Sequence, residues 1–126
     1  MMGRKKDRPR KRVMIVDDDD IFLEELKETL EHSGYQTTAI SDGEAAVKTA
    51  KEETPDLILL DLRMEKKSGF QVASELKGSH IPIVAMTGYY TRGEHSILMD
   101  ACRIQACIMK PFNPLDVISK IEWVCR

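Results

Sequence analysis

Five short runs of strand-forming residues, separated by segments of helical character, constrain the fold of this chain more than any other feature. The runs cover residues 13–16, 35–40, 56–60, 81–86 and 106–109. Most of them are continuously apolar, which is typical of strands buried on both faces of a sheet. Because strand and helix alternate five times, the sequence predicts a doubly wound α/β fold with a parallel sheet between two layers of helices.

The helices expected between these strands are indicated by the spacing of their apolar residues. Apolar residues recur at helical spacing in segments that begin near residues 21, 45 and 115. Further helices are expected over about 68–77 and 92–102. Gly34 stands where the first helix should end, because glycine commonly follows the last helical turn.

Length and composition are those of one soluble domain. The chain has 126 residues, of which 42% are hydrophobic and 32% are charged. No apolar run approaches the roughly 20 residues of a membrane-spanning helix, and residues 1–12 are too polar for a signal-peptide core. We therefore expect a cytoplasmic protein without membrane contact.

The three cysteines, Cys102, Cys107 and Cys125, show no metal-binding or redox spacing. None belongs to a CxxC pair, and no histidine lies at ligand spacing from them. We therefore expect reduced, mostly buried thiols.

The charge of the chain is divided unevenly along its length. Residues 1–12 carry seven basic side chains and one acidic one, although the whole chain has a net charge of −2. We interpret residues 1–11 as a basic, disordered arm ahead of a single domain over residues 12–126. A nucleic-acid contact is the alternative, but the arm has no interleaved aromatic residues, so we do not expect nucleic-acid binding from this chain.

Polar residues that suit phosphoryl chemistry stand directly after four of the expected strands. In a parallel α/β sheet the carboxyl ends of the strands share one edge, where ligands bind. The residues in question are Asp17, Asp18, Asp19, Asp61, Thr87 and Lys110. Taken singly, each has an ordinary structural explanation: the acids cap the first helix, the threonine lies in a turn, and the lysine lies on the surface. Their recurrence at successive strand ends favours a functional site.

The chemistry of these residues is that of a metal-assisted phosphoryl transfer. Crowded carboxylates raise one another's pKa unless a cation lies between them, and oxygen ligands suit Mg²⁺. Asp61 is the candidate nucleophile toward phosphorus, which would give an aspartyl phosphate. Mg²⁺ and Lys110 would stabilise the charge on the transferred group, and the Thr87 hydroxyl would donate a hydrogen bond to it.

In this order and spacing the motifs resemble the receiver domains of two-component response regulators. The resemblance extends from about residue 12 to residue 126, and rests on residues 15–19, 56–64 and 85–88, on Gly69, and on residues 110–112. It implies a flavodoxin-like fold of five parallel strands, in the order 2-1-3-4-5, with five helices. It also implies a signalling switch rather than an enzyme: a phosphoacceptor that assists its own phosphorylation and dephosphorylation.

The resemblance assigns a role to each candidate residue. Asp61 would be the phosphoacceptor, and Thr87 and Lys110 would contact the phosphoryl group. The metal ligands would be the carboxylates of Asp18 and Asp61, the backbone carbonyl of Arg63 and, through a bound water, Asp17. The bond between Lys110 and Pro111 would be cis.

The partners implied by the resemblance are proteins. The donor would be a sensor histidine kinase or a phosphotransfer protein. The output would be a changed surface at the fourth helix and fifth strand, which would bind a downstream effector or a second receiver. Arg63 and Tyr89 stand at the positions that set phosphate lifetime in the family, and because both are large we expect slow self-hydrolysis.

Three residues depart from the usual pattern of the family. Glu65 replaces the proline that usually follows the methionine after the acceptor, so we expect a looser loop. Cys107 replaces the tyrosine or phenylalanine whose ring swings inward on phosphorylation, and a thiol cannot make that movement. Arg103 replaces a glycine, so that turn is expected to differ.

Two other functions remain open from the sequence. One is a docking module of the same fold that signals without phosphorylation, an alternative that Glu65 and Cys107 favour mildly. The other is a small phosphatase of the haloacid dehalogenase type, since residues 17–19 supply its Asp-x-Asp spacing. That class also needs an acid after a later strand, and residues 85–88 and 109–111 supply none.

Overall fold

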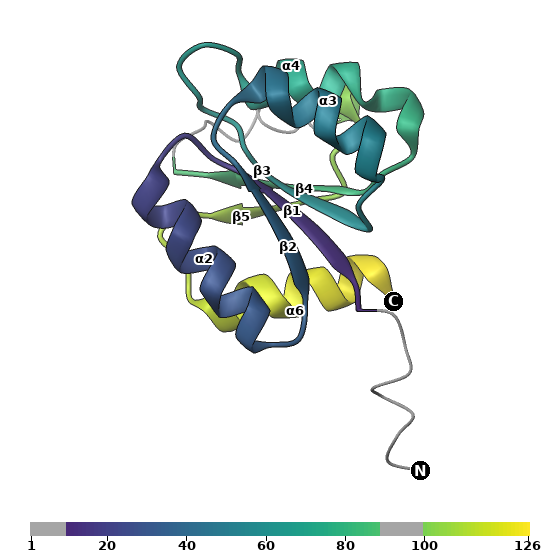
Figure 1. The fold of residues 1–126 in the computed structure, drawn as a ribbon. Coiled ribbons are helices and arrows are strands. Elements are labelled where there is room, and N and C mark those ends of the chain that lie inside the picture. The colour runs from purple at the N-terminus through teal and green to yellow at the C-terminus, as the bar shows by residue number, and fades with distance from the viewer. Residues whose placement is uncertain (1–9, 89–99) are drawn as a thin grey trace.

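A single parallel sheet forms the centre of the molecule, with helices on both of its faces (Figure 1). The computed structural model describes residues 10–88 and 100–126. In them the sheet has five strands in the order β2-β1-β3-β4-β5, which confirms the order that the resemblance implied. The strands are β1 (Arg12–Val16), β2 (Gln36–Ile40), β3 (Leu57–Asp61), β4 (Ile83–Thr87) and β5 (Ala106–Met109).

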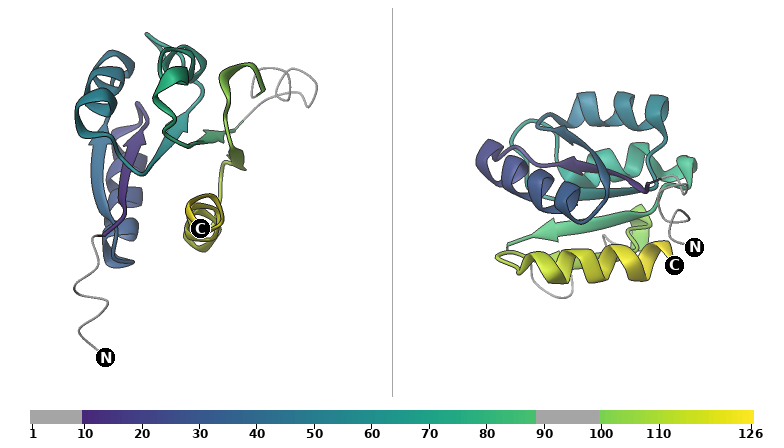
Figure 2. Two further views of the ribbon diagram at one scale, coloured as in Figure 1. Left: turned by 90° about the vertical axis from the view of Figure 1, so that its right-hand side faces the viewer. Right: turned by 60° about the horizontal axis from the view of Figure 1, so that its bottom comes forward.

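The helices lie in two layers (Figures 1 and 2). Helices α3 (Gly43–Glu53) and α4 (Gly69–Glu75) cover one face of the sheet. Helices α2 (Asp20–His32) and α6 (Pro114–Cys125) cover the other, and a short 3₁₀ turn, η1 (Lys77–Ser79), follows α4. The helix expected over residues 92–102 falls mostly outside the described residues, as does nearly all of the basic arm.

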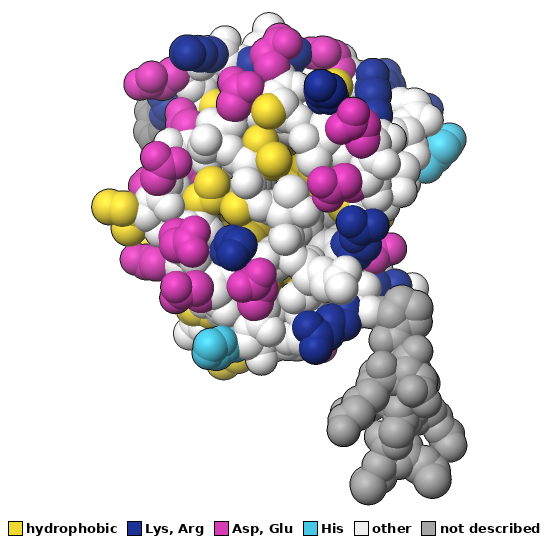
Figure 3. Space-filling view, in the orientation of Figure 1, with side chains coloured by type: hydrophobic (Ala, Val, Ile, Leu, Met, Phe, Trp, Pro, Cys, Tyr) yellow, Lys and Arg dark blue, Asp and Glu magenta, His cyan; other side chains and the backbone are white. Residues whose placement is uncertain are grey.

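Successive side chains of the central strands point to opposite faces of the sheet, and this divides the core into two clusters. In β1, Val13 and Ile15 pack in a cluster with α2 and α6, whereas Met14 and Val16 pack in a cluster with α3 and α4. Because both faces are covered, every residue of β3 and β4 is buried. This explains why these strands appear in the sequence as continuous apolar runs. The outer surface of α2 is acidic, and Figure 3 shows its carboxylates gathered on that side of the molecule.

Each described α-helix begins with a side chain that accepts hydrogen bonds from backbone N–H groups. These caps are Asp19 for α2, Asp42 for α3, Ser68 for α4 and Asn113 for α6. Such caps satisfy donors that have no partner within the helix. Because Asp19 caps α2, the two preceding acids, Asp17 and Asp18, are left to face the edge of the sheet.

Gly34 ends the first helix, as its position in the sequence predicts. The N–H of Gly34 donates to the carbonyl of Glu31 at 3.0 Å, and the N–H of Tyr35 donates to the carbonyl of Leu30 at 3.1 Å. This is the hydrogen-bond pattern of a Schellman motif. Gly34 has a φ of 97°, in the left-handed region that favours glycine.

We expect Gly34→Ala to lower the free energy of unfolding by about 1 kcal/mol, because a Cβ is disfavoured at this φ. Gly78→Ala is the matched control, since a Cβ added at either glycine meets nothing within 4 Å and only Gly34 has a positive φ. Urea denaturation of the two variants checks the expectation. A loss in Gly34→Ala no larger than that in Gly78→Ala would contradict it.

Candidate functional site

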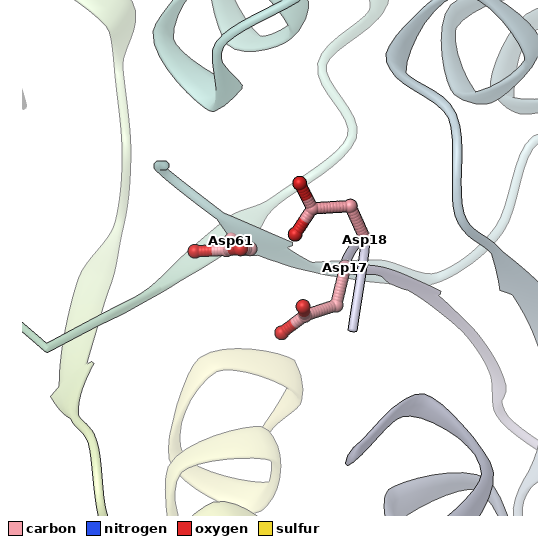
Figure 4. A group of neighbouring side chains, drawn as sticks. All are labelled: Asp17, Asp18 and Asp61. Carbon is pink, nitrogen blue, oxygen red and sulfur yellow. The ribbon is translucent and has the colours of Figure 1, made fainter. Parts of the chain in front are cut away.

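The carboxyl ends of β1 and β3 bring three aspartates together. The two strands are neighbours in the sheet, with Val16 opposite Leu60. Asp17 and Asp18 follow β1, and Asp61 is the last residue of β3. Each offers a carboxylate oxygen that lies within 4.8 Å of the other two, and Figure 4 shows the three side chains grouped at the ends of β1 and β3. The convergence expected from the sequence is therefore present.

Each of these carboxylates accepts a backbone hydrogen bond that fixes its direction. The N–H of Asp19 donates to Asp17 at 2.9 Å, and the N–H of Glu65 donates to Asp18 at 3.1 Å. The N–H of Arg63 donates to Asp61, also at 3.1 Å. Asp17 is fully buried and Asp61 is 6% exposed, whereas Asp18 is open to solvent.

Lys110 supplies the positive charge of the cluster. It follows β5, and its Nζ lies 2.6 Å from Asp17 Oδ2 and 4.0 Å from Asp61 Oδ1. Its backbone N–H donates to the carbonyl of Thr87 at 2.6 Å, so the ends of β4 and β5 are joined beside the acids. Thr87 is fully buried, and the bond between Lys110 and Pro111 is cis, as the resemblance implied.

The environment of Asp61 favours its protonated form. Burial raises the pKa of this carboxyl to about 6, and the nearby charges of Asp17 and Asp18 act in the same direction. The N–H of Arg63 and the ammonium of Lys110 lower the pKa but do not offset the burial. A divalent cation between the carboxylates would remove this cost, so the donor set fits a hard cation such as Mg²⁺.

The start of α4 closely approaches the backbone at the end of β3, at Gly69. A Cβ built on Gly69 would lie 2.2 Å from the backbone oxygen of Asp61 and 2.7 Å from the Cα of Leu62. Only glycine allows the start of α4 to approach Asp61 so closely. The sequence marked Gly69 as part of a motif but gave no physical reason for it.

The roles predicted from the sequence for Arg63, Asp17 and Tyr89 are supported only in part or lie outside the described residues. Arg63 contacts the site through its N–H, while no described contact tests the role of its carbonyl as a metal ligand. Asp17 is paired with Lys110, and its link to a metal through water stays a prediction. Tyr89 lies outside the described residues.

The three departures from the usual family pattern each have a structural counterpart. The N–H of Glu65 donates to Asp18, a hydrogen bond that a proline at this position could not make. This contact does not test the mobility of the loop, so the expected looser loop stays a prediction. Arg103 adopts a φ of 57°, in the left-handed region that favours glycine, and the expectation that this turn differs from the family's stays a prediction. Cys107 is half-buried on β5, and burial raises its thiol pKa.

Ion pairs of Lys67 also connect the loop after β3 to two helices. The Nζ of Lys67 lies 3.2 Å from Glu44 Oε1 on α3, and it forms a second ion pair with Glu75 on α4. No disulfide joins the three cysteines, which all lie in the described residues; Cys102 is buried, and Cys107 and Cys125 are half-buried.

The family of the chain follows from comparison with known proteins. The model of the response regulator receiver domain matches residues 13–122. The chain belongs to this family. Receiver domains act in two-component signalling as phosphoacceptors, and they interact with histidine kinases and effectors. The match favours this function over a phosphatase of the haloacid dehalogenase type.

Named relatives of this receiver agree with the assignment. The polar-differentiation response regulator DivK of Brucella anthropi is 36% identical over 117 residues, which cover 89% of this chain and 94% of that protein. A CheY-like receiver domain protein of Methanospirillum hungatei has 28% identity and a TM-score of 0.88, covering 93% of this chain and 94% of the other.

One further structural neighbour was solved with a metal. The receiver domain of a sensor histidine kinase of Pseudomonas aeruginosa has a TM-score of 0.82 and 24% identity, covering 91% of this chain and 97% of the other. Its structure has a magnesium ion coordinated in the active-site cleft.

Within the described part of this receiver, no helix has both the length and the apolar character needed to cross a bilayer.

We expect Asp61→Asn to be more stable than the wild type near pH 7 when divalent cations are absent. The pKa of Asp61 lies above its ordinary value of 3.8, so the folded protein binds more protons than the unfolded chain between about pH 4 and pH 6. Stability contributed by this group is therefore lost as the pH rises through that window. We expect a gain of about 2 kcal/mol for the variant at pH 7, shrinking toward pH 4.

Urea denaturation in EDTA at several pH values measures this gain. Asp116→Asn, which removes an exposed carboxylate on α6, controls for the change in net charge. A gain that is absent at pH 7, or that grows as the pH falls, would show that the acids do not destabilise the site.

Proposed function

We propose that this receiver is a phosphorylation-dependent switch in which Asp61 accepts a phosphoryl group from a phosphohistidine. The donor is a sensor histidine kinase or a phosphotransfer protein. The observation that carries the proposal is the burial of Asp61 beside two further carboxylates, with the Lys110 ammonium 4.0 Å from its oxygen. A buried acceptor between a cation site and a lysine suits transfer of an anionic group.

The transfer step has a simple balance. An oxygen of Asp61 forms a bond to phosphorus, while the bond from phosphorus to the imidazole nitrogen of the donor breaks. The electron pair of that bond stays on the imidazole, which leaves as the neutral ring when its other nitrogen already carries a proton. With acetyl phosphate as donor, the bond from phosphorus to the acyl oxygen breaks and acetate leaves.

The ligands proposed for Mg²⁺ are the carboxylates of Asp18 and Asp61 and the backbone carbonyl of Arg63, with Asp17 acting through a bound water. When bound, Mg²⁺ neutralises charge on the oxygens of the transferred group. The N–H of Glu65 orients Asp18, and that of Arg63 orients Asp61, so both carboxylates are directed before a cation arrives.

The switch would operate through the ends of β4 and β5. Phosphorylation adds a charge of about −1.5 to −2 and strong acceptor oxygens. Lys110 and the Thr87 hydroxyl would contact these oxygens, and the backbone hydrogen bond between the two residues couples their movements. Because Cys107 has no ring to swing inward, the change would reach β5 and the helix expected over residues 92–102 through the backbone.

We expect intact-protein mass spectrometry to detect one phosphoryl adduct after incubation with acetyl phosphate and Mg²⁺. The adduct should be absent when EDTA replaces Mg²⁺, because the metal neutralises the transferred group. It should also be absent in Asp61→Asn, which lacks the nucleophile. An adduct that persists in Asp61→Asn would place the acceptor elsewhere.

The same experiment separates the proposal from a docking module that signals without phosphorylation. The docking module predicts no adduct with acetyl phosphate and none with a phosphorylated histidine kinase domain. If the adduct forms, its decay after removal of the donor tests the slow self-hydrolysis expected from Arg63 and Tyr89. A half-life of only seconds would contradict that expectation.

A further inference from the structure

The aromatic ring of Phe22 lies against the lysine of the site. Phe22 is in the first turn of α2, and the Nζ of Lys110 lies 4.2 Å from the centroid of its ring. Phe112, two residues after this lysine, meets the same ring edge to face, with centroids 5.6 Å apart and an interplanar angle of 76°. A cation held over an aromatic face within about 6 Å is attracted by the ring quadrupole.

Local structure fixes the direction of the Phe22 ring. The N–H of Phe22 donates to the Asp19 cap, so the backbone at this point is held. Side chains at the start of a helix lean toward its N-terminus, which here is the sheet edge that carries the acids. The ring is thus directed into the site by the same cap that leaves Asp17 and Asp18 facing inward.

The ring completes the surroundings of an ammonium that must change partners. The Lys110 side chain is 24% exposed, and its Nζ lies 2.6 Å from Asp17 Oδ2 but 4.0 Å from Asp61 Oδ1. To meet a phosphoryl group on Asp61 it must shift a short way from one carboxylate toward the other. Because the attraction of the ring extends to about 6 Å, the ammonium can make this shift without leaving the aromatic face.

We propose that Phe22 is a positioning residue for Lys110, which keeps the ammonium at the acids and guides it to the phosphoryl group. The inference rests on the proposed function of Asp61. A simple packing role is the competing explanation, because both phenylalanines also pack against the core cluster beneath α2 and α6. The two explanations differ in one respect: packing depends on the shape of the ring, whereas attraction of a cation depends on its electron density.

The test compares rates of phosphorylation by acetyl phosphate at saturating Mg²⁺. Phe22→Leu should lower the rate constant by about three- to tenfold, because it keeps apolar bulk but removes the ring. Phe22→Tyr keeps the ring and should stay within about twofold of the wild type. Urea denaturation of both variants separates any loss of stability from the loss of rate.

Fluorinated phenylalanine at position 22 gives the decisive measurement. Successive fluorine atoms withdraw electron density with little change of shape, so the rate constant should fall stepwise with their number. The same residues at Phe70, which packs against the cluster on the opposite face of the sheet, are the matched control and should leave the rate unchanged. A rate that is insensitive to fluorination at Phe22 would overturn the inference.

A direct readout in the resting protein is independent of phosphorylation. In NMR spectra the ε-methylene protons of Lys110 should show an upfield ring-current shift that is lost in Phe22→Leu. Its absence in the wild type would also overturn the inference. If the wild type accepts no phosphoryl group, the proposed function fails and this inference with it; if it does and the ring is irrelevant, only the inference fails.

Discussion

Repulsion among three carboxylates at one sheet edge is the constraint on which the site depends. Asp17, Asp18 and Asp61 lie within 4.8 Å of one another, and two of them are buried. Such a group is stable only beside positive charge, which Lys110 supplies by its contact with Asp17. In the proposed function a divalent cation would relieve the repulsion further, and a phosphoryl group on Asp61 would give the lysine a new partner.

The sheet order explains why the rest of the chain is built as it is. β1 and β3 are central strands covered on both faces, so their ends are fixed by the core and not by loops. Gly69 lets α4 begin against the backbone of Asp61, and the Asp19 cap starts α2 just after the acid pair. Rigid support of this kind keeps the reacting groups in place before a ligand arrives.

The strands, the convergence of the acids and the position of Lys110 were predictable, because the spacing of apolar residues and the polar residues that follow each strand can be read from the sequence. Other features depend on three-dimensional contacts that leave no regular spacing in the sequence. Which of the acids caps α2 depends on backbone angles, and the N–H of Glu65 reaches Asp18 across 47 residues. In the sequence Phe22 is one more apolar residue of an amphipathic helix, because helical spacing does not reveal that the lysine following β5 lies over its ring.

Titration calorimetry of Mg²⁺ binding to the wild type and to Lys110→Met tests the electrostatic account most directly. Methionine keeps most of the unbranched side chain but removes the charge that lies 4.0 Å from Asp61. If positive charge is what holds the carboxylates together, the variant site is more negative, and it should bind Mg²⁺ several-fold more tightly than the wild type. Equal or weaker binding by Lys110→Met would contradict the account.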